Sequence, residues 1–487
     1  NAYNPLKDWG MQALIGTTTS TPCTAVVEQT HNDNMFQLTP SATAVESIQY
    51  DNAFRMCFSD PNQGSASADY IAENKLATKV AIIYNSSDTY SSGIYQTFAT
   101  EAKAKGLYEI IGAAIDDKYI AQVKAQVVNQ GAIDRMQDQI TIVYTPLHGT
   151  GNIPARRVMK ELGFTHVYVV PQQELPDGDF PTVSYPNPEA KEAFELGLAL
   201  AKKKNADLVL ATDPDADRLG VYVKDTKSGE YIPLTGNMSG SLLCEYVLSQ
   251  KQANGKIPAD GQVVKSIVTT NLVDAVAKNY GAELIEVLTG FKWIGKQVLK
   301  NEQEGKGTYL FGMEESYGCL IGTYARDKDA ISATAALCEA AAYYKEKGMT
   351  LWDAMVEMYE KYGYYKDEVK SIGLKGIEGL AKIQEIMEYF RAHTPSDFAG
   401  HKVLAVRDYK ADTVKDLATG EVKPTGLPSS NVLYYELEDN AWLCVRPSGT
   451  EPKIKFYYGV KGTSLEDAAA KSEKVGESVM AIVNGLL

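Results

Sequence analysis

The feature that most constrains this chain is a short acidic loop between two extended, apolar runs. Residues 213–218 read Asp-Pro-Asp-Ala-Asp-Arg, after the leucine-rich run 207–212 and before the extended run 219–223. Carboxylates at positions i, i+2 and i+4 of one loop repel one another, so either their pKa values rise or a cation lies among them. Carboxylate oxygens are hard ligands, and the loop therefore predicts a Mg²⁺ site, with Ca²⁺ as the second candidate. The candidate ligands are Asp213, Asp215 and Asp217.

This loop has two other possible interpretations. An EF-hand calcium loop is excluded, because its sixth position, normally Gly, is Arg218 and its twelfth, normally Glu, is Lys224. A solvated acidic turn stays open as the plainer alternative, since Asp is common in turns. Arg218, directly after the aspartates, favours a phosphorylated substrate, because the guanidinium group matches the geometry of phosphate oxygens.

Length and composition exclude several classes of protein. A chain of 487 residues predicts about three or four domains. No run approaches 18 apolar residues, so we expect no membrane-spanning helix and no membrane partner. The net charge of −14, without a block of Lys and Arg, argues against a nucleic-acid partner. The first residues resemble no signal peptide and the six cysteines form no Cys-x-x-Cys pair, so we expect reduced thiols and a cytoplasmic location. The oligomeric state stays open.

Residues 1–107 are interpreted as an α/β segment. Strands are expected at 13–16, 35–38 and 79–84, with a helix between the first two and another after the turn at 60–64. The Thr- and Ser-rich turns that follow the strands are either helix N-caps or part of a small-ligand site.

This segment resembles the type I periplasmic solute-binding proteins, in particular those that bind branched-chain amino acids. The resemblance covers the end of one lobe and the beginning of the other. It implies an amino-acid ligand contacted by Ser20, Ser41, Thr43 and Tyr90. The matching stretches are 16–20 (Gly-Thr-Thr-Thr-Ser), 39–43 (Thr-Pro-Ser-Ala-Thr), 60–64 (Asp-Pro-Asn-Gln-Gly) and 88–93 (Asp-Thr-Tyr-Ser-Ser-Gly).

Three further stretches of interest each follow an expected strand. Residues 145–151, Thr-Pro-Leu-His-Gly-Thr-Gly, lie between an expected strand and helix and are interpreted as mainly structural, with His148 as a turn residue. Glu314 and Ser316, after an expected strand at 308–311, can hydrogen-bond to adjacent sugar hydroxyls, or lie in a solvated loop. Residues 446–453, Arg-Pro-Ser-Gly-Thr-Glu-Pro-Lys, form a compact anion-binding turn or an ordinary β-turn.

From about residue 109 to the C-terminus, these stretches and the acidic loop resemble the α-D-phosphohexomutases, and residues 289–295 (Thr-Gly-Phe-Lys-Trp-Ile-Gly) add to the match. The resemblance implies interconversion of hexose 1- and 6-phosphates, with glucose preferred over mannose, Mg²⁺ on the three aspartates and glucose 1,6-bisphosphate as activator. It implies Lys328 as general acid/base, for which a helix-start ion pair is the alternative. The implied substrate ligands are Arg218, Thr289, Glu314, Ser316, Arg446, Ser448, Gly449, Thr450 and Lys455.

The sequence departs from this family in one respect. Phosphohexomutases carry a phosphorylated serine in a Thr-Ala-Ser-His-Asn-Pro-like loop, and the nearest string here, 29–33, lacks the serine. We therefore expect a chimera in which a solute-binding-protein fragment stands in place of the phosphoserine domain, and an inactive mutase. A binding protein for branched-chain amino acids, not an enzyme, is the competing hypothesis.

The expected fold class is α/β, with several mixed α/β sandwich domains and a smaller α+β C-terminal domain. Helices are expected at 332–347 and 351–365, followed by a looser, turn-rich region and then strands at 441–445 and 454–458. The expected domains are 1–107, 108–232, 233–365 and 366–487.

Overall fold

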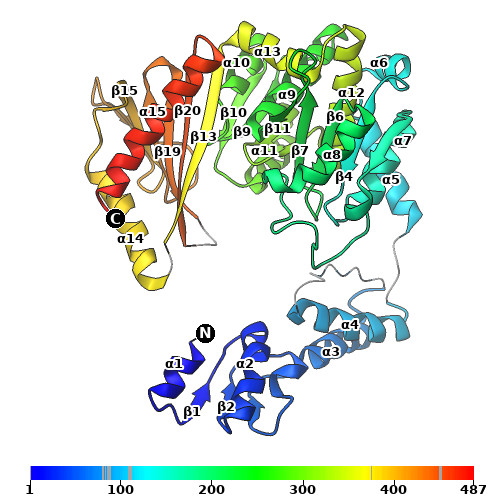
Figure 1. Cartoon of the computed structure of the whole chain (residues 1–487), viewed down its shortest axis with the longest axis vertical. Coiled ribbons are helices and arrows are strands. Elements are labelled where there is room, and N and C mark those ends of the chain that lie inside the picture. Colours follow the sequence, from blue (N-terminus) through cyan, green and yellow to red (C-terminus); the bar gives the residue numbers. More distant parts are fainter. Residues whose placement is uncertain are drawn as a thin grey trace. The chain divides into compact units, whose positions relative to one another are not determined.

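The computed structural model shows two compact units, Asn1–Asp116 and Asp117–Leu487 (Figure 1). It describes residues 2–78, 80, 82, 84, 89–107, 112–374, 376–448 and 452–487.

The first unit contains a parallel sheet of order β1-β2-β3, formed by Ala13–Ile15, Phe36–Thr39 and Ala53–Arg55. Helix α2 (Ser20–Asn32) lies against one face of the sheet, where Gln37 of β2 donates a hydrogen bond to Cys23 Sγ at 3.1 Å. The predicted strands at 13–16 and 35–38 are thus present. The predicted strand at 79–84 falls largely outside the described residues.

Two longer helices complete this unit. The turn predicted at 60–64 is wrong: these residues are the start of helix α3 (Asp60–Glu73), whose N-cap Ser59 accepts a hydrogen bond from the Asn62 N–H. The helix packs against α4 (Thr89–Ala104). A Cβ atom added at Gly64 would lie 2.1 Å from Thr97 Oγ1 and 2.4 Å from the Ile94 carbonyl oxygen. Glycine at this position therefore allows the two helices their close approach.

The second unit begins with the acidic-loop domain (residues 117–234). Its sheet has the order β5-β4-β6-β7-β8. All five residues of β6 are buried, which explains the continuous apolar run before the aspartates. Strand β7 pairs antiparallel with β6, so the acidic loop is the connection of a hairpin. The strands are His166–Val169 (β5), Thr141–Thr145 (β4), Leu208–Thr212 (β6), Leu219–Lys224 (β7) and Tyr231–Leu234 (β8).

The middle domain (residues 235–363) has a sheet of order β10-β9-β11-β12. Its alanine-rich helix α12 (Ala330–Glu346) is buried along most of its length and contacts both this domain and the acidic-loop domain. One continuous hydrophobic core joins the two domains. It includes Leu208 and Ile142 in the sheet of the acidic-loop domain and Leu242 and Leu337 of the middle domain. The strands are Glu283–Val287 (β10), Gly261–Ser266 (β9), Thr308–Glu314 (β11) and Gly318–Leu320 (β12), and helix α9 is Gly236–Ala253.

The C-terminal domain (residues 364–487) contains a sheet of order β13-β20-β19-β18-β15-β16-β17 with its own hydrophobic core. Helix α15 (Leu465–Asn484) packs along β13 and β20 (Figure 1). The other helix is α14 (Gly376–Ala392). The strands are Tyr364–Gly373 (β13), Lys453–Gly462 (β20), Trp442–Pro447 (β19), Leu433–Leu437 (β18), His401–Asp408 (β15), Thr413–Asp416 (β16) and Val422–Lys423 (β17).

Two expectations for this half of the chain were wrong. The turn-rich region expected after residue 365 is instead built of β13, α14 and strands of the large sheet. The helix expected at 351–365 is three residues shorter, because it is α13 (Leu351–Tyr362). Gly363 follows it with a φ of +108°, which is not a helical conformation and which residues with a side chain rarely adopt. The predicted fold class, several mixed α/β domains with a smaller α+β C-terminal domain, is confirmed. Among the described helices, none has the length and apolarity to cross a membrane.

Candidate active site

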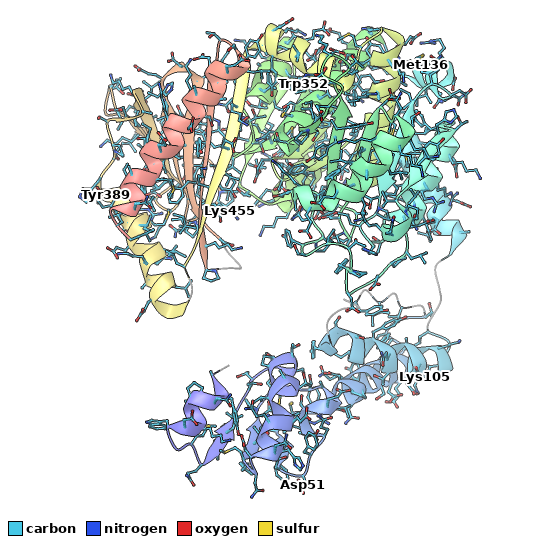
Figure 2. All side chains as sticks on the ribbon, viewed as in Figure 1. Asp51, Lys105, Met136, Trp352, Tyr389 and Lys455 are labelled. Carbon is cyan, nitrogen blue, oxygen red and sulfur yellow. The ribbon has the colours of Figure 1, made fainter. Side chains whose placement is uncertain are left out.

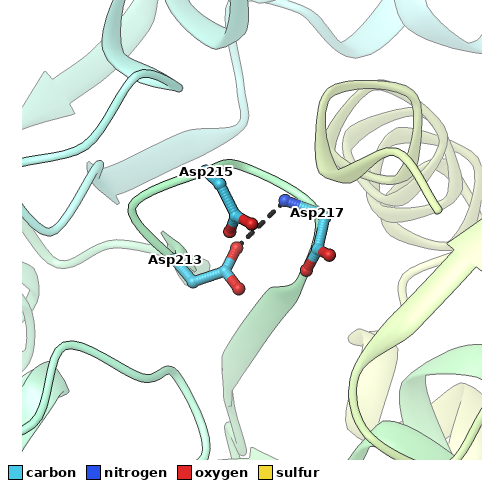
Figure 3. Close-up of side chains that lie close together, drawn as sticks. All are labelled: Asp213, Asp215 and Asp217. Atoms are coloured by element: carbon cyan, nitrogen blue, oxygen red, sulfur yellow. Dashed lines mark hydrogen bonds between the residues drawn. The ribbon is translucent and has the colours of Figure 1, made fainter. Parts of the chain in front are cut away.

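The three aspartates of the acidic loop lie together beyond the end of β6 (Figure 3). One carboxylate oxygen from each of Asp213, Asp215 and Asp217 lies within 4.8 Å of the other two. Asp213 Oδ1 accepts hydrogen bonds from the backbone N–H groups of Asp217 and Arg218, at 3.0 and 2.9 Å, so the loop curls around this carboxylate. Within the described part of the chain, this is the one group of three metal-ligating side chains so closely spaced.

The stretch 145–151 packs against the acidic loop at Pro214 and hydrogen-bonds to it. The N–H and hydroxyl groups of Thr150 both donate to the Pro214 carbonyl oxygen, at 2.8 and 3.0 Å. A Cβ atom at Gly149 would lie 2.3 Å from Pro214 Cα, so the two backbones touch. Both ring nitrogens of His148 lie within hydrogen-bonding distance of oxygen atoms, at 3.2 and 2.9 Å. These contacts support the structural interpretation of this stretch.

Two cations lie beside the three carboxylates. Lys328 Nζ is 2.8 Å from Asp217 Oδ2, and Arg218 Nε is 3.6 Å from Asp217 Oδ1 and 3.7 Å from Asp213 Oδ2. The N–H of Ala330, the first residue of α12, donates to the Ala216 carbonyl oxygen at 3.1 Å and ties the loop to the helix. Burial, with the charges of the neighbouring aspartates, raises the pKa of Asp213 to about 7. A cation bound among these carboxylates would oppose this rise in the pKa of Asp213, because positive charge favours the ionised form.

The stretches at 289–295 and 311–318 meet in the middle domain. Glu314, the last residue of β11, accepts a hydrogen bond from the Gly290 N–H at 2.7 Å. Burial raises the pKa of Glu314. The hydroxyl oxygen of Thr289 is buried, and no described group hydrogen-bonds to it. The predicted sugar ligands Thr289 and Glu314 are therefore brought side by side.

A cavity of about 240 Å³ lies within the second unit, and Glu315 and Ser316, which follow Glu314 in the chain, line it. Glu189 of the acidic-loop domain lines it, and its Oε1 atom lies 3.9 Å from Arg218 Nη1. Ser316 lines it from the middle domain and Lys455 from the C-terminal domain. All three domains of the second unit thus contribute polar groups to one cavity.

The predicted phosphate-binding turn follows β19. Arg446 and Lys455 are partners in the register of β19 and β20, which places their side chains on the same face of the sheet (Figure 2 labels Lys455). The Ser448 N–H donates to the Lys453 carbonyl oxygen at 2.8 Å. Gly449 and Thr450 lie outside the described residues.

In the first unit, two of the four predicted amino-acid ligands lie together. Ser20 Oγ accepts hydrogen bonds from the backbone N–H groups of Thr43 and Ala44, both at 3.1 Å. Ser41 is exposed, and the Tyr90 hydroxyl donates to Gln63 at 3.3 Å. The Ser20 hydroxyl therefore has a structural use of its own.

Three family profiles match the second unit in succession. "Phosphoglucomutase/phosphomannomutase, alpha/beta/alpha domain II" matches residues 117–229, domain III of the same family matches 235–362, and its C-terminal domain matches 397–473. The chain belongs, over these residues, to the phosphoglucomutase/phosphomannomutase family. The resemblance of the chain to the phosphohexomutases from about residue 109 onward is confirmed.

Curated relatives agree with this family. A phosphoglucomutase from Staphylococcus aureus strain MRSA252 is 35% identical over 359 residues, which are 74% of this chain and 62% of the relative. A phosphoglucomutase from Staphylococcus epidermidis strain ATCC 12228 is 36% identical over 337 residues, 69% of this chain and 60% of the relative. The chain thus spans less than two thirds of the length of these relatives.

Solved structures share the fold. The Paramecium pp63/parafusin phosphoglucomutase aligns with a TM-score of 0.51 at 18% identity, over 75% of this chain and 62% of that chain. A phosphoglucomutase/phosphomannomutase family protein from Burkholderia thailandensis aligns with a TM-score of 0.50 at 17% identity, over 98% and 91% of the two chains.

The sequence interpretation missed the four acidic residues that line the cavity, which are Glu189, Glu315, Asp367 and Glu368. Glu315 lies inside the predicted sugar-binding stretch, but only its neighbours Glu314 and Ser316 were singled out. Glu189 follows a Pro-Asn-Pro turn that carries no signal for a site. The fold brings these four residues, which lie in distant segments of the sequence, to one cavity.

Proposed function

We propose that the second unit forms the metal- and substrate-binding part of a hexose phosphate mutase, which interconverts hexose 1-phosphate and hexose 6-phosphate. The observation that carries this proposal is that three clustered carboxylates and two cationic side chains lie close to a polar cavity. Lys328 and Arg218 lie beside the carboxylates. Arg218 also contacts Glu189, which lines the cavity together with Ser316 and Lys455.

The acidic loop fits Mg²⁺ as its metal. Its donor set is three carboxylates within 4.8 Å of one another, and hard oxygen ligands are those that Mg²⁺ prefers. When bound, Mg²⁺ stabilises negative charge on a phosphoryl oxygen. The ligands would be Asp213, Asp215 and Asp217.

The other groups fit a phosphorylated sugar. Lys328, held by Asp217, would move a proton to or from the reacting hydroxyl. Thr289, Glu314 and Ser316 would hold the sugar, and Arg218 would orient its phosphate. We further propose that glucose 1,6-bisphosphate is the activator and that the reaction is cytoplasmic, in keeping with six cysteines that form no disulfide. The phosphate would be bound by the turn residues Arg446, Ser448, Gly449 and Thr450 and by Lys455 of β20.

We infer that residues 1–107 come from a solute-binding-protein framework and supply no phosphorylated serine. In the described part of this unit, the buried hydroxyl of Ser20 is engaged by two backbone N–H groups, which supports a structural use. The 487 residues alone would then bind a sugar phosphate without turning it over.

Calorimetric titration with glucose 1-phosphate, at saturating Mg²⁺, tests the proposed binding function on the full chain. We expect one site per chain with affinity that falls as salt is added, because charged groups dominate the contact. Absence of binding at millimolar ligand would contradict the proposal.

A further inference from the structure

Glu315 is a carboxylate of the cavity that the proposed function does not use. It follows Glu314 at the end of β11 and lines the cavity together with Ser316. Its Oε2 atom accepts a hydrogen bond from Ser266 Oγ at 3.2 Å, and Ser266 is held in turn by the Thr269 hydroxyl at 2.9 Å. The loop after β9 therefore holds this side chain.

The backbone of Glu315 is fixed by the beginning of helix α9. A Cβ atom added at Gly236 would lie 2.1 Å from the Glu315 carbonyl oxygen and 2.4 Å from the Tyr317 nitrogen. Helix and loop are thus in direct backbone contact, which leaves the loop little freedom to withdraw Glu315 from the cavity.

Both signs of charge surround the Glu315 carboxyl group. Burial, followed by repulsion from Glu314, raises its pKa to about 7, while Ser266 and the charge of Arg446 act in the opposite direction. Lys455, the strand partner of Arg446, lines the same cavity. The other titratable groups around this cavity are Glu189, Tyr317, Asp367, Glu368, Cys444 and Tyr457.

We propose that Glu315 takes up a proton when a sugar phosphate enters this cavity, and so sets the pH range over which the cavity binds such ligands. The inference rests on the proposed function. A phosphate dianion attracted by Arg446 and Lys455 brings negative charge toward a carboxylate that is already poorly solvated. The proton comes from solvent and binds a carboxylate oxygen of Glu315. The neutral carboxyl group then has an O–H that can donate to a ligand oxygen.

The number of protons taken up is measurable by calorimetry. Glucose 1-phosphate is titrated into the full chain at pH 7.5 with saturating Mg²⁺, in HEPES and in Tris, whose ionisation enthalpies differ. At this pH the free ligand is already a dianion, since the second pKa of a phosphate monoester is about 6. A group with a pKa of about 7 is roughly one quarter protonated at pH 7.5, so the uptake is at most about three quarters of a proton.

A variant pair separates Glu315 from the other carboxylates. We expect Glu315→Gln to abolish most of the uptake, while Glu368→Gln, which removes another carboxylate of the cavity, retains it. Uptake that is absent in the wild type, or unchanged in Glu315→Gln, overturns the inference and leaves the proposed function intact. A wild-type chain that binds no glucose 1-phosphate overturns both.

The wild-type chain supplies a second measurement that needs no variant. Because the bound state holds more protons, affinity for glucose 1-phosphate must rise as the pH falls from about 8.5 to 7. We expect the Kd to increase by up to about tenfold per pH unit above pH 7.5. A Kd that is constant over this range overturns the inference.

Discussion

The ammonium group of Lys328 lies 2.8 Å from Asp217 Oδ2, so a lysine just before helix α12 neutralises the last aspartate of the acidic loop. Both side chains are partly buried, with 14% and 28% of their surface exposed. The lysine and a divalent metal ion would therefore compete for the same carboxylate.

Removing this competitor should strengthen metal binding. We expect Lys328→Met to increase Mg²⁺ affinity by about three- to tenfold, because a positive charge next to the metal ligands is lost. Calorimetric titration with Mg²⁺ measures the change. Lys345→Met is the matched control, because Lys345 pairs with Asp207 at 2.6 Å outside the site. Equal effects of the two substitutions would argue against the competition.

Weaker Mg²⁺ binding is expected when Asp215, the middle aspartate of the acidic loop, is replaced. Asp215→Asn should weaken Mg²⁺ binding by at least roughly tenfold, since an amide oxygen replaces one of three carboxylates at a hard cation. The same titration checks it, with thermal unfolding to confirm that the variant is folded. An unchanged affinity would remove this loop from the metal site.

The phosphate-binding turn is tested through its arginine. A charge-assisted hydrogen bond is worth about 1.5–3 kcal/mol, so Arg446→Ala should weaken glucose 1-phosphate binding by at least about tenfold. Lys423→Ala serves as the control, because this lysine is exposed on β17 of the same sheet. If both variants bind as the wild type does, the turn does not hold the phosphate.

The first unit should not bind branched-chain amino acids. Such a clamp buries most of its ligand between two lobes, whereas residues 1–107 resemble only the end of one lobe and the beginning of the other. Leucine at millimolar concentration should therefore leave the thermal unfolding temperature unchanged. A clear upward shift would revive the hypothesis of a binding protein.

Turnover is the last property to test. Phosphoryl relay requires a nucleophile that holds the group between half-reactions, and removal of a nucleophile from an active site costs on the order of 10⁶ in rate. We expect the 487-residue chain not to convert glucose 1-phosphate to glucose 6-phosphate, even with Mg²⁺ and glucose 1,6-bisphosphate. A coupled dehydrogenase assay measures the product. Turnover of roughly 1–10³ s⁻¹ would mean that a nucleophile is present and was missed.

The acidic loop could be predicted because its signals are local. A fully buried strand, three alternating carboxylates and a second strand follow one another within residues 208–224. The C-terminal sheet was harder to predict, because β13 is largely exposed and pairs with β20 across a long stretch of chain. Alternation of apolar residues is weak in such a strand, and the pairing partner cannot be read from nearby sequence.

The cavity shows a second limit. Glu314 and Glu315 are chemically identical and adjacent, and no local pattern distinguishes them. One accepts a hydrogen bond from the Gly290 N–H and the other from the Ser266 hydroxyl. Only the packing of loops that follow different strands determines which glutamate accepts a hydrogen bond from which group.

Helix α12 links the position of the acidic loop to packing in the interior of the protein. The helix is buried along most of its length, mainly against neighbouring helices of the second unit, and the N–H group of its first residue, Ala330, donates to the Ala216 carbonyl oxygen of the loop. A larger side chain in place of one of its buried alanines would have to displace a neighbouring element. Substitutions far from any ligand, such as Ala336→Leu, would then displace the carboxylates by shifting their anchor. Overpacking in this helix would therefore lower the metal affinity together with the stability of the protein.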